Sequence, residues 1–306
     1  MSRLEDVLAA GQFAITAEVT PPLSADPNRL LRLVEPLRGR ADAINITDAA
    51  RARVHASSLA AAALLQRAGI EPIVQMTCRD RNRIALQCDL LGAAALGIEN
   101  VLALRGDDPK EGDQPDAKPV FDLDSRSLLE TASGLMAGSL PNGTAIEPPP
   151  RFFLGAADTP IDPPSGWRPH ALSVKAASGA RFIQTQFCFD IDVVRRWAAV
   201  LDGEGLTERI WVLVGVGPLV SAKSARWMRE HLWGTLMPDA LIARLEGAED
   251  EAEEGRRITV ELLEQLTEVK GIAGAHLMAP RHHHLLPELI EESGLIARRG
   301  AGARRR

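Results

Sequence analysis

The chain has 306 residues, of which 45% are hydrophobic and 25% are charged, and its formal net charge is −6 at pH 7. These are the proportions of a folded globular protein, and the acidic balance argues against binding to nucleic acid or to an anionic membrane, which need a cationic surface. The sequence contains no run of 18 apolar residues and no signal-peptide pattern. We therefore expect a cytoplasmic protein that acts on small molecules.

The cysteine and tyrosine content limits which side chains can form disulfides, bind metal or transfer protons. The three cysteines, Cys78, Cys88 and Cys188, are far apart and have no C-x-x-C spacing. This pattern predicts neither a disulfide framework nor a zinc site, and we expect buried thiols that pack as small apolar residues. Tyrosine is absent, which leaves Asp, Glu, His, Lys and Cys as candidates for proton transfer.

Short apolar runs alternate with longer helical patterns along the chain, which is typical of repeated βα units. The runs predict strands at 14–19, 43–47, 72–77, 100–105, 151–155, 182–187, 210–216 and 274–278. Eight parallel strands close a barrel, so the sequence predicts an α/β fold made of a single (βα)8 TIM barrel over residues 1–297. We expect the basic tail, residues 298–306, to be disordered.

The helices between the strands have recognisable ends. Asp26 precedes Pro27 and a run of leucines, which predicts a helix with an N-cap and a proline in its first turn. Residues 55–68 are rich in alanine and favour a helix. Residues 82–96 repeat apolar side chains at helical spacing and stop before Gly97, a typical C-terminal cap.

Polar segments interrupt this pattern in several places. Residues 108–124 and 156–170 are too long and polar for tight turns, and we expect both to form loops at the active-site rim. The acidic run 246–254 predicts a solvated helix face or a helix start rather than a metal site. The consecutive histidines 282–284 project in different directions, so we expect no metal site there either.

Polar side chains follow several predicted strands at the point where each strand ends. Glu18 comes just before two prolines, and Asp107 follows Arg105 and Gly106 after the fourth strand. A carboxylate at the C-terminal end of a barrel strand is more often functional than structural. Glu18 has the position of a partly buried proton donor, although an ion pair with an arginine across the barrel would also explain it. Nearby charge and loop amides favour an ionised Asp107 with an electrostatic role.

Two further residues are candidates for binding. Gln186, beside Phe187 and Phe189 near the end of the sixth strand, offers a donor and an acceptor to the edge of a heterocycle. The two phenylalanines form either a flat wall or part of the core. Lys175 precedes the same strand and is either a phosphate ligand or an exposed helix lysine.

Five motifs occur in an order and spacing that resemble one known family. They are AEVTPP at 17–22, NITD at 45–48, MTCRD at 76–80, LRGD at 104–107 and QTQFCFD at 184–190. From about residue 10 to residue 297 the chain resembles the methylenetetrahydrofolate reductase family. The resemblance implies a flavin-containing oxidoreductase of one-carbon metabolism that reduces 5,10-methylenetetrahydrofolate to 5-methyltetrahydrofolate.

The same resemblance implies cofactors and residue roles. The flavin is FAD or FMN, and NADH or NADPH supplies electrons by ping-pong exchange. Glu18 is the acid that helps to open the methylene bridge, and Asp107 lies between flavin and pterin. The implied cofactor-binding residues are Thr47, Arg105, Gly106, Asp107, Phe121 and Lys175. The implied substrate-binding residues are Gln186, Trp227, Met228 and Arg281.

The chain also departs from the family pattern. Gln75 replaces a histidine of the third strand, and residues 154–157 and 277–280 differ from the usual turns after the fifth and eighth strands. The resemblance further implies self-association or a partner subunit. Two alternatives remain: a non-catalytic barrel subunit associated with folate or a corrinoid, and another flavin barrel such as a proline dehydrogenase-like enzyme.

Overall fold

The structure, a computed structural model, describes residues 1–296. Its strands pair in parallel and in sequence order to form a closed barrel, β1-β2-β3-β4-β5-β6-β7-β8, in which β1 also pairs with β8. The strands are Ala14–Val19, Ala43–Ile46, Pro72–Thr77, Asn100–Leu104, Phe153–Asp158, Phe182–Phe187, Trp211–Val216 and Ile272–Leu277. The predicted (βα)8 barrel is confirmed.

The largest errors in the predicted strands are at β5 and β8. The structure has β5 at 153–158 rather than 151–155, and β8 at 272–277 rather than 274–278. Small residues fill the centre of both strands, and glycine and alanine have low strand propensity, so the apolar pattern locates these ends poorly. The predicted end of the barrel domain and the basic tail lie outside the described residues.

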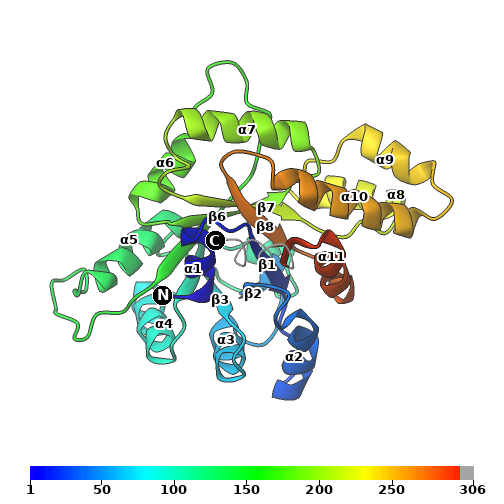
Figure 1. Ribbon diagram of the computed structural model, residues 1–306. Helices are drawn as coiled ribbons and strands as arrows, with labels where there is room; N and C mark the ends of the chain where they lie inside the picture. The colour runs from blue at the N-terminus through cyan, green and yellow to red at the C-terminus, as the bar shows by residue number, and fades with distance from the viewer. Residues whose placement is uncertain (297–306) are drawn as a thin grey trace.

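Helices surround the barrel (Figure 1). They are α1 Arg3–Ala9, α2 Pro27–Val34, α3 Ser58–Arg67, α4 Arg83–Ala95, α5 Ser125–Met136, α6 His170–Ala177, α7 Ile191–Gly203, α8 Ala222–His231, α9 Asp239–Glu246, α10 Glu251–Leu266 and α11 Leu286–Ser293. Asp26 caps α2 as predicted, because its side chain accepts a hydrogen bond from the backbone N–H of Asn28. Within residues 1–296 no helix combines the length and hydrophobicity needed to cross a bilayer.

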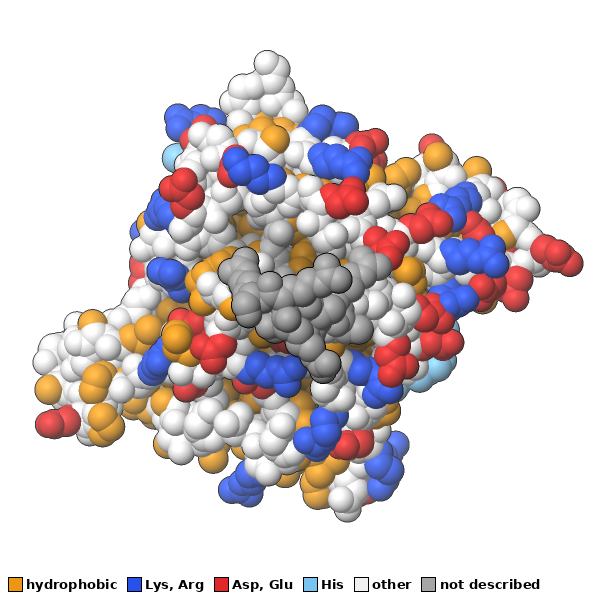
Figure 2. Space-filling view, in the orientation of Figure 1, with side chains coloured by type: hydrophobic (Ala, Val, Ile, Leu, Met, Phe, Trp, Pro, Cys, Tyr) orange, Lys and Arg blue, Asp and Glu red, His pale blue; other side chains and the backbone are white. Residues whose placement is uncertain are grey.

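The acidic run at 246–254 is confirmed as a helix start. The Asp250 side chain accepts hydrogen bonds from the first turn of α10, and the helix begins at Glu251. Neighbouring arginines pair with acids of this run. Arg244, for example, contacts Glu254, and it also contacts Glu261 further along α10. Figure 2 shows acidic and basic side chains interspersed over this part of the surface.

The end of the barrel where the strands begin is closed by α1. Leu4 and Leu8 of α1 pack in one apolar cluster with side chains from the starts of the strands, including Ile73, Phe153 and Phe182. The two phenylalanine rings are stacked with centroids 4.9 Å apart. This apolar plug leaves the carboxyl ends of the strands as the open end of the barrel.

A polar layer lies above this plug, inside the barrel. Gln184 and Asn45 exchange two side-chain hydrogen bonds of 2.6 and 2.9 Å, and Gln184 also donates to Thr16. All three side chains are buried. Since these amides satisfy one another, the layer forms a fixed floor beneath the open end of the barrel.

The cysteine prediction is right for two of the three residues. Cys78 and Cys188 are buried, and burial raises the pKa of the first thiol to about 11 and of the second to about 12. Cys88 is exposed, which contradicts the expectation of a buried thiol. It lies on the solvent-facing part of α4, whose alanine-rich sequence distinguishes its two faces weakly.

Candidate active site

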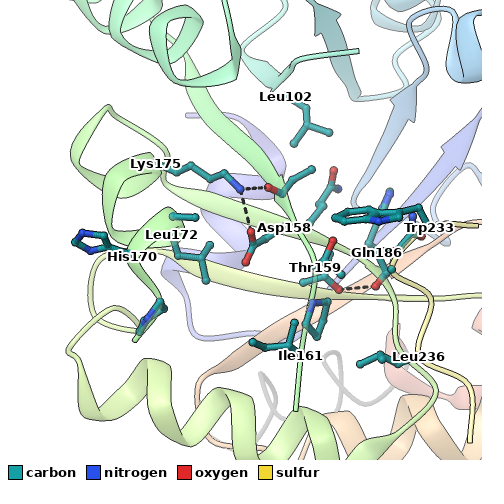
Figure 3. Close-up of a pocket in the computed structure, with 18 of the residues that line it drawn as sticks. Leu102, Asp158, Thr159, Ile161, His170, Leu172, Lys175, Gln186, Trp233 and Leu236 are labelled. Carbon is teal, nitrogen blue, oxygen red and sulfur yellow. Dashed lines mark hydrogen bonds and ion pairs between the residues drawn. The ribbon is translucent and has the colours of Figure 1, made fainter. Parts of the chain in front are cut away.

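A cavity of about 870 Å³ opens at the carboxyl end of the barrel. Its wall includes side chains from five strands, β1, β4, β5, β6 and β8, and from the segments that follow β5, α8 and β8, as Figure 3 shows for part of it. Three of the predicted site residues line this cavity, namely Glu18, Lys175 and Gln186. We call this space the central cavity.

Glu18 is held at the floor of the central cavity by two side chains from other strands. Gln75 Nε2 donates a hydrogen bond of 2.8 Å to Glu18 Oε2. His276 Nε2 lies 3.7 Å from the same oxygen. The Glu18 side chain is 24% exposed, whereas His276 is almost completely buried. The alternative expectation of an arginine partner for Glu18 is wrong, because its partners are an amide and an imidazole.

His276 contacts the buried polar layer through one ring nitrogen and Glu18 through the other. Thr16 Oγ1 accepts a hydrogen bond from Gln184 Nε2 and lies 3.0 Å from His276 Nδ1. The tautomer of neutral His276 with its hydrogen on Nε2 satisfies both contacts, because Thr16 then donates to Nδ1 and the Nε2 hydrogen faces the Glu18 carboxylate.

This arrangement makes the two oxygens of Glu18 unequal. Oε2 faces the N–H groups of Gln75 and His276, while Oε1 has no hydrogen-bond partner among residues 1–296. A proton on Oε1 is thus the one available to a molecule in the central cavity. The same two donors stabilise the negative charge that remains after the proton has left.

Lys175 enters the central cavity from α6 and is 19% exposed, so the alternative of an exposed helix lysine is wrong. Its Nζ donates to Ala157 O at 2.6 Å and to Asp158 Oδ1 at 2.9 Å. Burial raises the pKa of Asp158, and the neighbouring ammonium group opposes that shift. One of the three N–H donors of Lys175 remains for a ligand.

Trp227, Met228 and Arg281 line a second, smaller cavity of about 250 Å³ between α8 and the segment after β8. The Arg281 guanidinium lies 5.1 Å from the Trp227 ring centroid, in the geometry of a cation–π contact. Met278 belongs to the walls of both cavities, so the two are neighbours.

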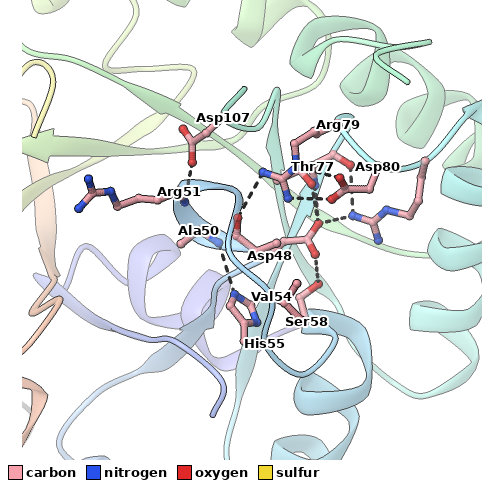
Figure 4. A network of polar contacts seen from close by, with 12 residues as sticks. Asp48, Ala50, Arg51, Val54, His55, Ser58, Thr77, Arg79, Asp80 and Asp107 are labelled. Atoms are coloured by element: carbon pink, nitrogen blue, oxygen red, sulfur yellow. Dashed lines mark hydrogen bonds and ion pairs between the residues drawn. The ribbon is translucent and has the colours of Figure 1, made fainter. Parts of the chain in front are cut away.

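Asp107 lies on the same end of the barrel but outside the walls of both cavities. Its Oδ2 accepts a hydrogen bond of 2.7 Å from the backbone N–H of Arg51, as Figure 4 shows. Arg51 belongs to a segment after β2 in which Ala49 and Ala52 also have positive φ values, between 49° and 55°. Asp107 therefore stabilises a segment whose backbone is unfavourable for residues with a side chain.

Below this segment lies a buried cluster of charged groups. Asp48 accepts hydrogen bonds from the N–H and hydroxyl of Thr77, from Ser58 and from Arg81. Arg79, which is almost completely buried, donates to the backbone oxygen of Ala49. These bonds explain the NITD and MTCRD motifs by a structural role, because they fasten the loops after β2 and β3 together.

The other predicted cofactor residues surround this cluster. The Arg105 guanidinium lies 4.4 Å from the centroid of the Phe121 ring. Thr47 is buried at the end of β2, with its hydroxyl 3.4 Å from His55 Nε2. Gly106 has a φ of +89°, and a Cβ there would lie 3.0 Å from side-chain atoms of Arg79 and Thr77.

Comparison with known proteins decides the family. The family model described as methylenetetrahydrofolate reductase matches residues 3–294. This chain belongs to the methylenetetrahydrofolate reductase family. The resemblance inferred from the five motifs is confirmed.

Relatives of this reductase-family chain are distant. It is 24% identical to the probable methylenetetrahydrofolate reductase (NADPH) of Caenorhabditis elegans, an alignment that covers 96% of this chain and 44% of that protein. It is 23% identical to methylenetetrahydrofolate reductase 2 of Saccharomyces cerevisiae, over 68% of this chain and 34% of that protein. The chain thus spans less than half the length of these curated relatives.

Solved structures support the fold of this methylenetetrahydrofolate reductase family member. One is a Clostridium thermocellum protein described as binding two copies of 5-methyl-5,6,7,8-tetrahydrofolic acid, with a TM-score of 0.61 and 13% identity over 96% of this chain and 99% of that one. Another is the EDTA monooxygenase of Chelativorans sp. BNC1, with a TM-score of 0.59 and 14% identity over 94% of each chain. At these identities the likeness concerns the barrel alone.

The predicted site residues of the family member thus fall into three groups. The first group, Glu18, Lys175 and Gln186, lines the central cavity. The second group, Trp227, Met228 and Arg281, lines the smaller cavity beside it. The third group lies on the rim after β2 and β4 and consists of Thr47, Arg105, Gly106, Asp107 and Phe121. Sequence reasoning missed His276, although its place in AGAHL makes it an inward-facing strand position. It also missed Asp158 as a strand-end acid, because the predicted fifth strand stopped too early.

Proposed function

We propose that this protein reduces 5,10-methylenetetrahydrofolate to 5-methyltetrahydrofolate, with electrons that NADH or NADPH delivers by way of a flavin, FAD or FMN. The observation that carries the proposal is the partly exposed carboxyl group of Glu18, whose Oε1 is free at the floor of the central cavity. The match to the methylenetetrahydrofolate reductase family over residues 3–294 supports a folate as the molecule that this carboxyl group protonates.

The residues around the central cavity fit a flavin in size and charge. The cavity holds about 870 Å³, and Lys175 has an N–H donor left for a phosphate oxygen. Arg105, stacked on Phe121, offers a second cation at the rim. We propose that Lys175 holds the phosphates and that Arg105, Gly106, Phe121 and Thr47 contact the rest of the cofactor. The bound flavin would supply a hydride, which these side chains do not carry.

Glu18 is proposed to act as the general acid on the folate. The methylene carbon of the substrate bridges N5 and N10, and a proton delivered from Glu18 Oε1 to N10 lets the bond between that carbon and N10 break. The bonding electron pair goes to N10, and an N5 iminium cation remains as the hydride acceptor. Gln75 and His276 hold Glu18 in place and stabilise its carboxylate after the transfer.

Gln186 and Asp107 are proposed to recognise the substrate and its charge. Gln186 Oε1 accepts a hydrogen bond of 2.9 Å from the backbone N–H of Phe187, which leaves its NH₂ group for the edge of the pterin. Oδ2 of Asp107 accepts a hydrogen bond from the backbone N–H of Arg51, and we propose that its other oxygen stabilises the positive charge of the iminium. We propose that Trp227, Met228 and Arg281 contact the remainder of the substrate or the nicotinamide.

Two half-reactions test this function separately. Oxidation of NADH or NADPH with an artificial acceptor tests the flavin and the nicotinamide. Formation of 5-methyltetrahydrofolate tests the acid and the folate contacts. We expect both with the purified protein, and a protein that performs neither after addition of FAD or FMN would refute the proposal.

A further inference from the structure

Trp233 is the most exposed large hydrophobic side chain among residues 1–296, at 83%. An indole has a large apolar surface, and exposure of that surface to water is unfavourable. Trp233 is also one of the residues that line the central cavity. A side chain with these two properties stands at the mouth of a cavity with most of its surface available to a ligand.

The turn that carries Trp233 is firmly attached to the barrel. Gly234 has a φ of +79°, and a Cβ there would lie 2.6 Å from Thr159 Cγ2 and 3.6 Å from Gln186 Cγ. On the far side of the turn, Leu236 N donates to Phe187 O at 3.0 Å, and Phe189 N donates to Leu236 O at 2.8 Å. These contacts fix the backbone beside Trp233, so the indole has a defined location although it is exposed.

Its position relative to Glu18 suggests which part of a ligand it meets. Glu18 contacts Gln75 and His276 from inside the barrel and lies at the cavity floor. Trp233 follows α8 and stands beside Gln186 at the edge of the same cavity (Figure 3). A ligand that reaches Glu18 with one end and extends along this wall toward solvent therefore meets Trp233.

We propose that Trp233 determines folate affinity by stacking on the benzoyl ring of the substrate, an inference that rests on the proposed function. The atoms that react with Glu18 are at the pterin end and at N10, so these must lie at the floor. The benzoyl ring is attached directly to N10 and therefore extends toward the mouth. Stacking on an exposed indole is a strong and geometrically tolerant way to bind such a flat ring.

Calorimetric titration of the 306-residue protein tests this contact. The ligands are 5-methyltetrahydrofolate and 6-methyltetrahydropterin, which lacks the benzoylglutamate. The variants are Trp233→Ala, Trp233→Phe and, as a matched control, Ile84→Ala, which removes an exposed apolar side chain that lines neither the central cavity nor its smaller neighbour. Circular dichroism checks that each variant is folded.

We expect Trp233→Ala to raise the Kd for 5-methyltetrahydrofolate about tenfold. Trp233→Phe, which keeps an aromatic face, should stay within about threefold of the parent protein. The Kd for the pterin should not change, and Ile84→Ala should bind both ligands as the parent does.

An unchanged folate Kd in Trp233→Ala, or an equal loss for folate and pterin, would overturn the inference while the proposed function stands. A parent protein that binds neither ligand would instead refute the proposed function, and this inference with it. The two failures are therefore distinguishable in one set of titrations.

Discussion

Glu18→Gln tests the proposed acid function of Glu18 without disturbing the rest of the site. Glutamine has nearly the same shape as glutamate, and its carbonyl oxygen still accepts the hydrogen bond that Gln75 Nε2 now donates to Oε2. What disappears is the acidic proton that Oε1 would deliver. The substitution therefore removes the proton donor and keeps the side chain in its place beside Gln75.

The expected magnitudes for folding and catalysis differ widely. A hydrogen bond to a charged acceptor is worth at most about 3 kcal/mol and one to a neutral acceptor about 1 kcal/mol, so in either protonation state of Glu18 the free energy of unfolding should fall by no more than about 2 kcal/mol. Loss of a positioned general acid lowers a rate by about 10²–10⁴, which corresponds to about 3–5.5 kcal/mol in the activation barrier.

The assay compares the two half-reactions in parent and variant. Formation of 5-methyltetrahydrofolate should fall by this factor, while oxidation of NADH or NADPH with an artificial acceptor should continue at the parental rate. Glu246→Gln is the matched control, because Glu246 pairs with Arg226 on the surface outside both cavities. Equal folate turnover in Glu18→Gln and the parent would remove Glu18 from the mechanism.

Three further predictions concern the rest of the chain. A thiol reagent at pH 8 should label one thiol, Cys88, in the folded protein and three after unfolding, since burial raises the pKa of the other two; rapid labelling of all three in the folded state would contradict the structure. Gly155→Ala should lower the free energy of unfolding by about 1–3 kcal/mol, because its Cβ would lie 2.3 Å from the Phe182 ring, whereas Gly92→Ala, with no neighbour within 4 Å, should raise it by about 0.5–1 kcal/mol in urea denaturation. Burial in the folded state raises the pKa of Asp158, so the folded protein binds this proton more tightly than the unfolded chain does. The stability that the bound proton contributes is therefore present at acid pH and is lost as the pH rises through the raised pKa. The unfolding free energy of Asp158→Asn relative to the parent should therefore increase from pH 4 to pH 7, and a constant difference would contradict this sign.

The barrel was predictable from sequence because its strands are apolar runs of regular spacing. Polar residues near the carboxyl ends of those runs were expected at the open end of the barrel, which is how Glu18 and Gln186 were predicted. The same rule applies to His276, but its role becomes visible only when β8 closes against β1 and brings the imidazole to within 3.7 Å of Glu18 Oε2. Such a contact depends on barrel closure, which no local pattern encodes.

The loops at the rim were less predictable for a different physical reason. Ala49, Arg51 and Ala52 have positive φ values that their residue types do not signal, and the Asp107 carboxylate binds the backbone of this segment rather than the central cavity. The exposure of Trp233 likewise depends on how Gly234 packs against Thr159, a contact between segments far apart in the sequence.

An anaerobic titration followed by absorbance tests the central claim most directly. The purified protein, supplied with FAD or FMN, is reduced with NADH or NADPH and then mixed with 5,10-methylenetetrahydrofolate. The account predicts that the nicotinamide bleaches the flavin and that the folate restores its absorbance, with one 5-methyltetrahydrofolate formed for each flavin reoxidised. A flavin that is never bleached, or one that stays reduced in the presence of the folate, would contradict it.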